Sequence, residues 1–330
     1  MIKAGLLPLV AIGEMNKTFP NNNSNTQNII DCQSNISHSF IRSYDAVKIQ
    51  GLIIPTKNNL NNITSIEINI GGNTIFSIPF DIIKANNTMI IEDDYYITIP
   101  DEIFGNYYGD FVIKNKFLIP LICLRYHDVE FILIARDDNQ FYNFNYQIMI
   151  HQIYYQSDIR KNMVQKNKSE NIIYQYQSFP IVGNSNTIDP RLLMTGIYIK
   201  SLSSIIKYEL LLNNILYRSI EKNMILYNRY LQSKRSLWTK KHSLTLEFSL
   251  NTILPLEIIY MIEEYVKDKY EYLYYFPIAD YNHITINCDK VDNIKINLIS
   301  ENEKYDGKIY VKNLNLLVIH DGIVGIRYMN

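Results

Sequence analysis

The sequence predicts a mainly β protein built from antiparallel β-sandwiches. Short apolar runs recur along the chain and are separated by turn residues, which is the spacing typical of sandwich strands. Residues 65–70 alternate strictly between polar and apolar, as a half-buried strand does. The 330 residues suffice for one large core or two medium ones.

The N-terminal region joins an apolar stretch to a polar one. Residues 5–13 read GLLPLVAIG, but this run is short for a secretory signal, contains Pro8 and lacks a small-residue cleavage site. We therefore expect no signal peptide. Residues 14–38 are rich in Asn and Ser, which predicts an exposed arm or loop.

The first clear β-hairpin is expected at residues 65–78. Gly71 and Gly72 interrupt the alternation, and a second β-like run follows them. A tight turn needs positive φ, which glycine adopts at little steric cost. Replacement of Gly71 or Gly72 by Val is therefore expected to cost about 1–3 kcal/mol.

Further strands are expected in the first half of the chain. Residues 95–99 form one short β-like run, and residues 117–124 are continuously apolar, as in a buried strand. Pro120 should mark a strand start or an edge, because proline donates no ladder hydrogen bond. Residues 129–133 predict another strand, which ends before a polar turn at 136–139.

A polar segment separates two β-rich regions. Residues 157–171 are charged and lack an apolar period, which predicts a loop or linker. The second region begins near Thr195. Within it, residues 205–220 repeat the pattern of residues 63–78, with a strand, an Asn- or Gly-containing turn and a strand.

One stretch, residues 254–266, departs from the β pattern. Its apolar positions have helical spacing and Pro255 lies in the first turn, so we expect an amphipathic helix packed on a sheet. Its LPxEI-like start also allows an F-box-like element. Strands then resume in four segments separated by turns, one of which is Lys312–Asn313: 284–288, 294–299, 308–311 and 314–319.

Charge and cysteine usage exclude several classes of protein. A net charge of −1 argues against nucleic-acid binding driven by phosphate neutralisation. No apolar run approaches the roughly 20 residues of a membrane span. The three cysteines are far apart and show no CxxC or zinc-type spacing, so we expect reduced structural thiols.

No motif predicts catalysis. His127 and Asp128 are neighbours, but consecutive side chains of a strand point to opposite faces, so they cannot form a dyad. His320 and Asp321 meet the same objection. The other candidates lack partners or the rest of their motif: His151, His242, the pair Gly71–Gly72 and the basic residues 234–241. We therefore expect no catalytic residue, no cofactor-binding residue and no metal ligand.

The end of the chain resembles the C-terminus of the major capsid proteins of large eukaryotic (nucleocytoplasmic) DNA viruses. In that family a segment like tiNfSRIDN-x-L-x-L precedes one like Y-x-x-NYNVLRIMSGMAGLAYSN. Residues 285–296 (TINCDKVDNIKI) and 310–330 (YVKNLNLLVIHDGIVGIRYMN) follow the same order and spacing. Arg327 and Met329 stand where the family has small residues.

Three earlier segments are similar to the same family. Residues 66–73 (IEINIGGN) resemble VELEIGGQ, and residues 119–129 (IPLICLRYHDV) resemble LPLIALQYHEV. Residues 5–16 (GLLPLVAIGEMN) resemble the family's opening segment GGLLQLVAYGAQD, which implies an N-terminal arm under the capsomer. Residues 140–280 carry no matching motif.

The resemblance implies a double jelly roll, that is, two antiparallel jelly-roll sandwiches in tandem. The chain is shorter than is usual for the family, so the loops above each jelly roll must be reduced. The implied parts are an N-terminal arm (1–45), a first jelly roll (46–156), a linker or loop (157–180) and a second jelly roll (181–330) with the short helix near 255–266 inserted.

The implied function is that of a viral capsid-like structural protein, a short and diverged paralogue that self-assembles through jelly-roll interfaces. The resemblance implies no enzyme activity and no cofactor. Its implied partners are two further copies in a homotrimer and other capsid proteins, without nucleic acid and without a membrane span. It allows a position near an inner viral membrane. The implied location is the virion, and the host cytoplasm during assembly.

The alternative function is a capsid-derived, non-enzymatic binding module. In it, the F-box-like helix near 255–266 would contact host or viral proteins. The oligomeric state separates the two hypotheses, because a shell protein should form trimers and a binding module should stay monomeric.

Overall fold

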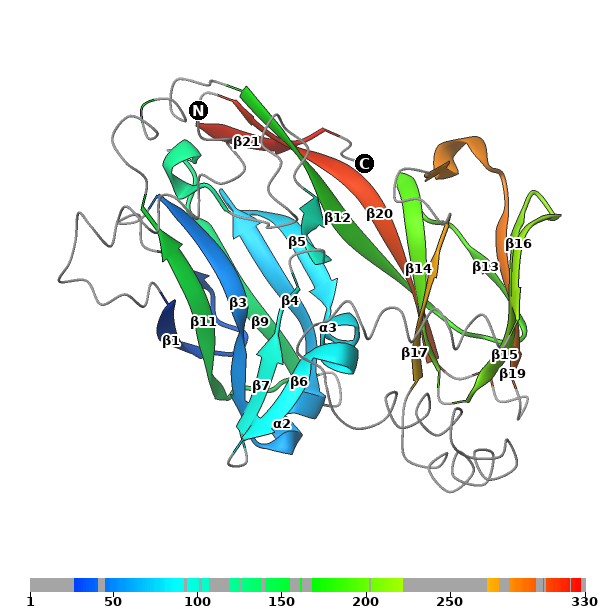
Figure 1. The fold of residues 1–330 in the computed structure, drawn as a ribbon, viewed down its shortest axis with the longest axis horizontal. Coiled ribbons are helices and arrows are strands. Elements are labelled where there is room, and N and C mark those ends of the chain that lie inside the picture. The colour runs from blue at the N-terminus through cyan, green and yellow to red at the C-terminus, as the bar shows by residue number, and fades with distance from the viewer. Residues whose placement is uncertain are drawn as a thin grey trace, which may run out of the picture. The chain divides into compact units, whose positions relative to one another are not determined.

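The structure is a computed structural model of the chain (Figure 1). The expected helix near 255–266, the apolar stretch 5–13 and the basic run 234–241 lie outside the residues that it describes. The described residues are 27–40, 45–91, 94–100, 103–106, 119–124, 126–137, 140–154, 161, 168–201, 203–221, 272–278, 285–300, 305, 307–320 and 322–327.

The chain forms two compact units. Unit 1 comprises Met1–Gln175 and Leu314–Asn330, and unit 2 comprises Tyr176–Asn313. Two long strands, β12 (Lys168–Pro180) and β20 (Gly307–His320), have residues in both units.

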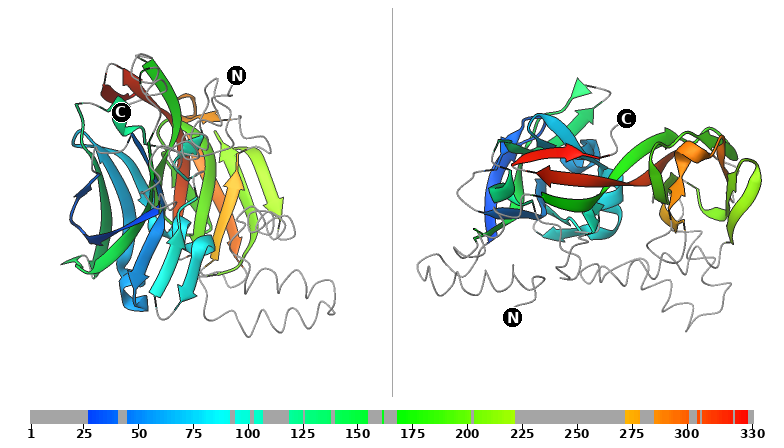
Figure 2. Two further views of the ribbon diagram at one scale, coloured as in Figure 1. Left: turned by 60° about the vertical axis from the view of Figure 1, so that its left-hand side comes forward. Right: turned by 90° about the horizontal axis from the view of Figure 1, so that it is seen from above.

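Unit 1 is a sandwich of two antiparallel sheets that face each other (Figures 1 and 2). The first sheet contains, in spatial order, β1 (Gln27–Gln33), β11 (Asn145–Ile153), β3 (Ala46–Pro55), β7 (Asp94–Thr98) and β6 (Thr88–Ile91). The second contains β10 (Gln140–Phe141), β9 (Val129–Asp137), β4 (Ile63–Ile70) and β5 (Asn73–Pro79), with β2 (His38–Ser39) also paired to β9.

The core of unit 1 lies between these sheets. The predicted alternation of β4 is confirmed, because Ile66 and Ile68 are fully buried and Ile70 is nearly so. Strands β9 and β11 also turn alternate residues inward, among them Phe131 and Ile148. Each such side chain stabilises the fold by roughly 1.5–3 kcal/mol on burial.

Short helical segments and two short strand pairings complete unit 1. The helix α3 buries Ile82 and Ile83 and follows Pro79, which has the backbone angles of a strand end. Strand β8 pairs with the start of β12, and β21 pairs with the end of β20. The bounds are α2 (Lys57–Asn62), α3 (Phe80–Asn87), the 3₁₀ helix η3 (Leu121–Cys123), β8 (Gly105–Asn106) and β21 (Ile323–Ile326).

Unit 2 also contains two sheets. One is formed by β17 (Tyr272–Pro277), β14 (Leu193–Ser201) and the unit 2 parts of β20 and β12, with β18 (Ile286–Asn287) also on β14; the 3₁₀ helix η5 (Cys288–Lys290) follows β18. The other contains β13 (Ser185–Ile188), β19 (Ile294–Ser300), β15 (Ile205–Leu212) and β16 (Ile215–Glu221).

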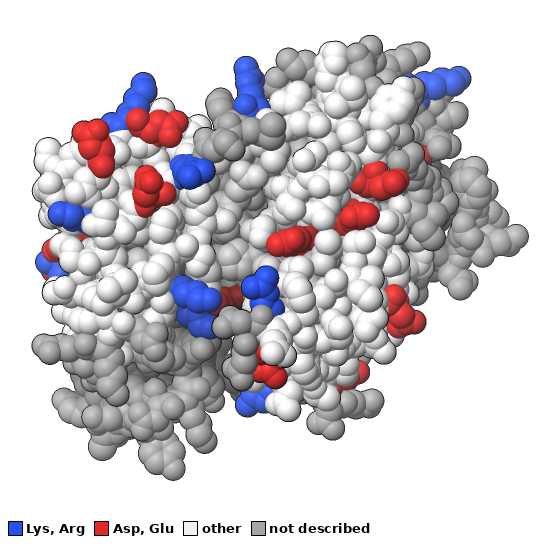
Figure 3. All heavy atoms as spheres, turned by 180° about the vertical axis from the view of Figure 1, so that it is seen from behind, with Lys and Arg blue, Asp and Glu red and all other residues white. Residues whose placement is uncertain are grey.

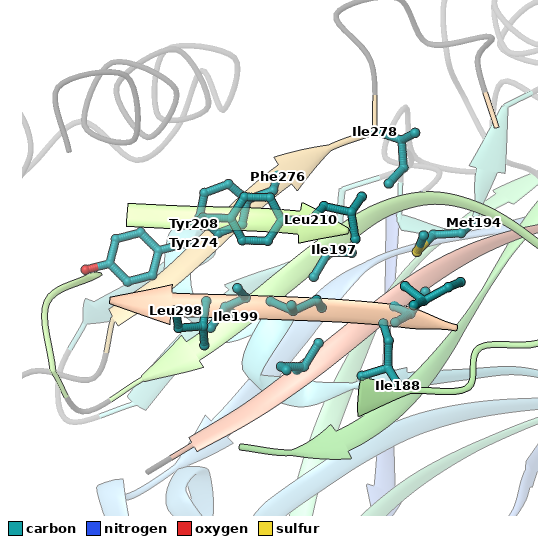
Figure 4. Packing of buried hydrophobic residues seen from close by; sticks show 14 of the residues in the cluster. Ile188, Met194, Ile197, Ile199, Tyr208, Leu210, Tyr274, Phe276, Ile278 and Leu298 are labelled. Atoms are coloured by element: carbon teal, nitrogen blue, oxygen red, sulfur yellow. The ribbon is translucent and has the colours of Figure 1, made fainter. Parts of the chain in front are cut away.

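Aromatic rings dominate one end of the unit 2 core (Figure 4). Tyr208 of β15 and Phe276 of β17 stack with ring centroids 4.1 Å apart and an interplanar angle of 4°. The Tyr274 ring centroid lies 6.3 Å from that of Phe276, and the Tyr274 hydroxyl accepts a hydrogen bond from the Ile205 amide at 3.2 Å. This stack joins the two sheets of the unit.

The two predicted hairpins are confirmed. Strands β4 and β5 meet at Gly71 and Gly72, which have φ of 59° and 79°. Strands β15 and β16 meet at Asn213 and Asn214, with φ of 50° and 64°, the left-handed angles that a type I′ turn requires. The repeat seen in the sequence therefore corresponds to one hairpin in each unit.

Several expected elements differ from the structure. The segment 157–180, expected as linker or loop, contains the strand β12, and the arm expected at 1–45 contains β1 and β2. The final residues, expected in the second jelly roll, belong to unit 1 from Leu314 onward.

The prediction of a strand at 117–124 is wrong for residues 119–124, the part of it that the structure describes. Ile119 forms an isolated bridge to Val47, and after Pro120 the chain enters η3. Pro120 therefore stands before a helical turn, where its missing N–H costs nothing.

The turn expected at Lys312–Asn313 is also wrong, because β20 runs straight through it. Asn313 and Asn315 are fully buried and donate from Nδ2 to Gln177 Oε1 at 2.9 Å and Gln175 Oε1 at 2.8 Å of β12. Side-chain amides thus pair across two strands, so asparagine marks no turn here.

Candidate assembly surface

The residues around His127 form a packed turn and not a strand. His127 and Asp128 lie between η3 and β9, and the Gly71 amide donates to the Asp128 carbonyl at 2.9 Å. The half-buried His127 ring lies directly over Gly71: a Cβ added there would sit 2.1 Å from Nδ1. The ring therefore packs the β4–β5 turn onto the start of β9.

The other histidine candidates lie apart from each other. His151 is half-buried on β11, opposite Lys48 of β3. His320 is exposed at the end of β20. Asp321 and His242 lie outside the described residues.

No metal centre is formed within the described part of the chain: no three His, Cys, Asp or Glu side chains gather there closely enough to hold an ion. Of the helices in the same described residues, none is long and apolar enough to cross a membrane.

None of the three cysteines, all of which the structure describes, is in a disulfide, and the thiol pKa is strongly raised in two of them. Burial, followed by the nearby Asp31 carboxylate, raises the pKa of Cys32 to about 11. Burial is also the main cause that raises the pKa of Cys288 to about 11. Both thiols are therefore protonated, and poor nucleophiles, at neutral pH.

We expect native Cys32 and Cys288 to be alkylated at pH 8 roughly a hundredfold more slowly than the same cysteines in denaturant, where their pKa returns to about 8.5. Peptide-resolved mass spectrometry of iodoacetamide-treated protein measures both rates. Equal rates in the native and denatured protein would show that neither thiol is shielded.

The central strands of the first sheet separate at one end. Strand β1 stays paired with β11 as far as Gln33 and Asn145, and β3 stays paired with β7 as far as Pro55 and Asp94. The pairing of β11 with β3, in contrast, stops at Gln147 and Ile53.

This separation opens a hollow of about 570 Å³, which we call the β11–β3 depression. Ile53 and Pro55 are its aliphatic residues, and Ile53 is only 6% exposed. Gln147 donates from Nε2 to Asp31 Oδ1 at 2.8 Å. The lining residues are Asp31, Cys32, Gln33, Ile53, Pro55, Asp94, Asn145, Tyr146 and Gln147.

The charged residues that line the β11–β3 depression, among those described, are acidic. Among the lining residues that the structure describes, two carry carboxylates, Asp31 and Asp94, and none is a lysine, arginine or histidine. Burial raises the pKa of Tyr146, so its phenol stays neutral. Aliphatic residues beside carboxylates suit a lysine or arginine, whose apolar stem can be buried while its charge pairs with the acid.

Three exposed apolar side chains gather on the edge strand β16, and one lies on β21. On β16 they are Ile215, Leu216 and Tyr217, which are 73%, 54% and 44% exposed. On β21, Ile323 is 57% exposed. Such edges offer unpaired backbone groups together with apolar area, and both favour association with another chain.

Charges are mixed on the face that Figure 3 shows. Acidic and basic side chains lie in small groups among uncharged residues, and neither sign forms a continuous field over the described part of that face. This distribution agrees with the net charge of −1.

Comparison with known proteins gives no match to a protein-family model and none to a curated protein sequence. Solved structures do match. VP54 of the virus PBCV-1, from a crystal structure fitted into a reconstruction of the virophage Sputnik, is 12% identical with a TM-score of 0.57. A chain of a quasi-atomic model of the PBCV-1 capsid is 13% identical with a TM-score of 0.58. Each match covers 92% of this chain and 97% of the other.

The likeness shows the fold of this chain. It is mainly β and contains two antiparallel sandwiches, the double jelly roll that the sequence resemblance implied. The β11–β3 depression was not predicted, because it depends on where two strands distant in sequence stop pairing. In the sequence, Asp31 lies in the segment expected as an arm or loop and Asp94 directly precedes an expected strand, so neither position indicates a shared hollow.

Proposed function

We propose that this chain is a viral capsid-like structural protein without enzyme activity, which self-associates into a homotrimer and packs against other capsid proteins. The observation that carries the proposal is the extent of the fold likeness, which spans 92% of this chain and 97% of the PBCV-1 chains. We place its site of action in the virion, after assembly in the host cytoplasm.

The fold suits such a role for physical reasons. A jelly-roll sandwich is rigid and has short or covered edges, so it keeps its shape when many copies press together. Three chains with two sandwiches each give a nearly hexagonal particle, which tiles a surface. Function then resides in interfaces, and the exposed apolar edges β16 and β21 favour such contacts.

Light scattering behind size exclusion tests the proposal. We expect a mass near three times the 38.8 kDa of one chain, and we expect the protein at high copy number in purified virions. A monomer at micromolar concentration that is absent from virions would contradict the proposal.

A further inference from the structure

Residues 27–39 run along one edge of unit 1 and pair with both of its sheets. Strand β1 lies at the outside of the first sheet, next to β11, and β2 pairs with β9 of the second (Figure 1). We propose that these residues form a releasable strap, which opens as one piece while both sheets stay folded, and that unit 1 associates with a second copy through the strand edges thus uncovered. The inference goes beyond the proposed function, since the strap would open in a monomer or a trimer alike.

The strap crosses from one sheet to the other at Ser34 and Asn35, which we call the clasp. Ser34 is fully buried, and its hydroxyl donates to the Tyr142 carbonyl and accepts from the Phe144 amide, both at 2.9 Å. Asn35 donates from Nδ2 to the same Tyr142 carbonyl at 3.0 Å, and its Oδ1 accepts from the Ala135 amide of β9 at 2.8 Å. The clasp therefore fastens the strap to both sheets at one point.

Away from the clasp, the strap buries little apolar surface. Ser34 is the one buried residue of 28–39, and the apolar side chains of Ile29 and Ile36 are 59% and 52% exposed. Backbone pairing and the clasp thus hold most of the strap. A segment with few buried apolar contacts opens locally at a lower free energy than the whole domain unfolds.

The strap is anchored where it ends. Phe40 is 5% exposed, and its amide donates to the Val129 carbonyl at 2.9 Å. Because this core side chain lies outside the strap, opening leaves it in place.

Opening uncovers two strand edges together. The edge of β11 loses its partner β1, and β9 loses its pairing with β2 at Glu130 and Phe131. Uncovered strand edges pair readily with another chain. A second copy whose strap is open offers the same edges, so the strap decides whether unit 1 associates through them.

Cys32 lies on the strap and reports its opening, while Cys288 of unit 2 is the internal control. Ser34→Ala and Asn35→Gly each remove bonds of the clasp, and glycine tolerates the φ of 62° found at Asn35. We expect each variant of the full-length chain to raise the alkylation rate of native Cys32 by about tenfold or more, with the Cys288 rate unchanged. Peptide-resolved mass spectrometry of iodoacetamide-treated protein measures both rates.

Light scattering behind size exclusion tests the association. The double variant, Ser34→Ala with Asn35→Gly, should form species larger than those of the wild type, because β11 and β9 stay uncovered for longer. Adding Ile29→Cys and Met149→Cys, at directly opposite positions of β1 and β11, allows a disulfide that holds the strap closed. Oxidation should then suppress the larger species, and reduction should restore them.

Ser37→Ala is the matched control, because Ser37 is exposed on the strap outside the clasp, and it should change neither rate nor mass. Unchanged Cys32 rates in both clasp variants, or equal rises for Cys32 and Cys288, would overturn the strap. Faster Cys32 alkylation without larger species would overturn association through the uncovered edges. The mass of the wild type alone tests the proposed function, so the two can fail separately.

Discussion

Gly71→Val is expected to destabilise the protein by roughly 2–6 kcal/mol, more than the 1–3 kcal/mol that backbone strain alone accounts for. Gly71 has φ of 59°, which disfavours a β-branched residue. In addition, the new Cβ would overlap the His127 ring at 2.1 Å. The free energy of unfolding, from urea denaturation followed by circular dichroism, measures the effect.

The neighbouring glycine is the matched control. Gly72 has φ of 79°, but nothing lies within 4 Å of an added Cβ, so Gly72→Val should cost only about 1–3 kcal/mol. In a Gly71→Val, His127→Ala double variant the clash is removed, and part of the loss should be recovered. Equal losses for both glycines would show that the His127 contact is unimportant.

Phe276→Ala is expected to cost about 3–5 kcal/mol, because it leaves a cavity in the unit 2 core. Phe276 is 1% exposed and its ring stacks on Tyr208, which is equally buried. The two sheets of the unit meet at this stack, so the substitution removes packing contacts from both sheets. Urea denaturation again gives the change in unfolding free energy.

Two variants bracket this prediction. Phe276→Leu keeps most of the volume and should lose clearly less than Phe276→Ala. Tyr217→Ala removes a ring that is 44% exposed on β16, and should change stability by no more than about 0.5 kcal/mol. A Phe276→Ala loss as small as that of Tyr217→Ala would contradict the packing described for unit 2.

Local patterns in the sequence predicted the hairpins. Alternation in β4 and the glycines after it act within a few residues, and the same holds for β15, β16 and their asparagine turn. Wherever local preference and packing agree, the expected element and the observed one coincide.

The incorrect predictions concern segments whose structure depends on pairing with residues distant in the sequence. Residues 157–171 are polar enough to predict a loop, and the expected linker reaches residue 180, yet from Lys168 onward β20 supplies the partner that makes this segment a strand. Pro120 ends a run that is apolar enough for a strand. The β11–β3 depression is set by pairing between strands almost a hundred residues apart, which no local pattern reports.

The amide pairs between β12 and β20 carry a further consequence, for the alignment of the two strands. If β20 slipped by two residues in one direction, Asn313 would face Phe179, and in the other Asn315 would face Ile173. Either slip buries an amide without a partner, which costs roughly 1–3 kcal/mol. A uniformly apolar pair of strands would tolerate the shift, so these asparagines specify a single register between β12 and β20.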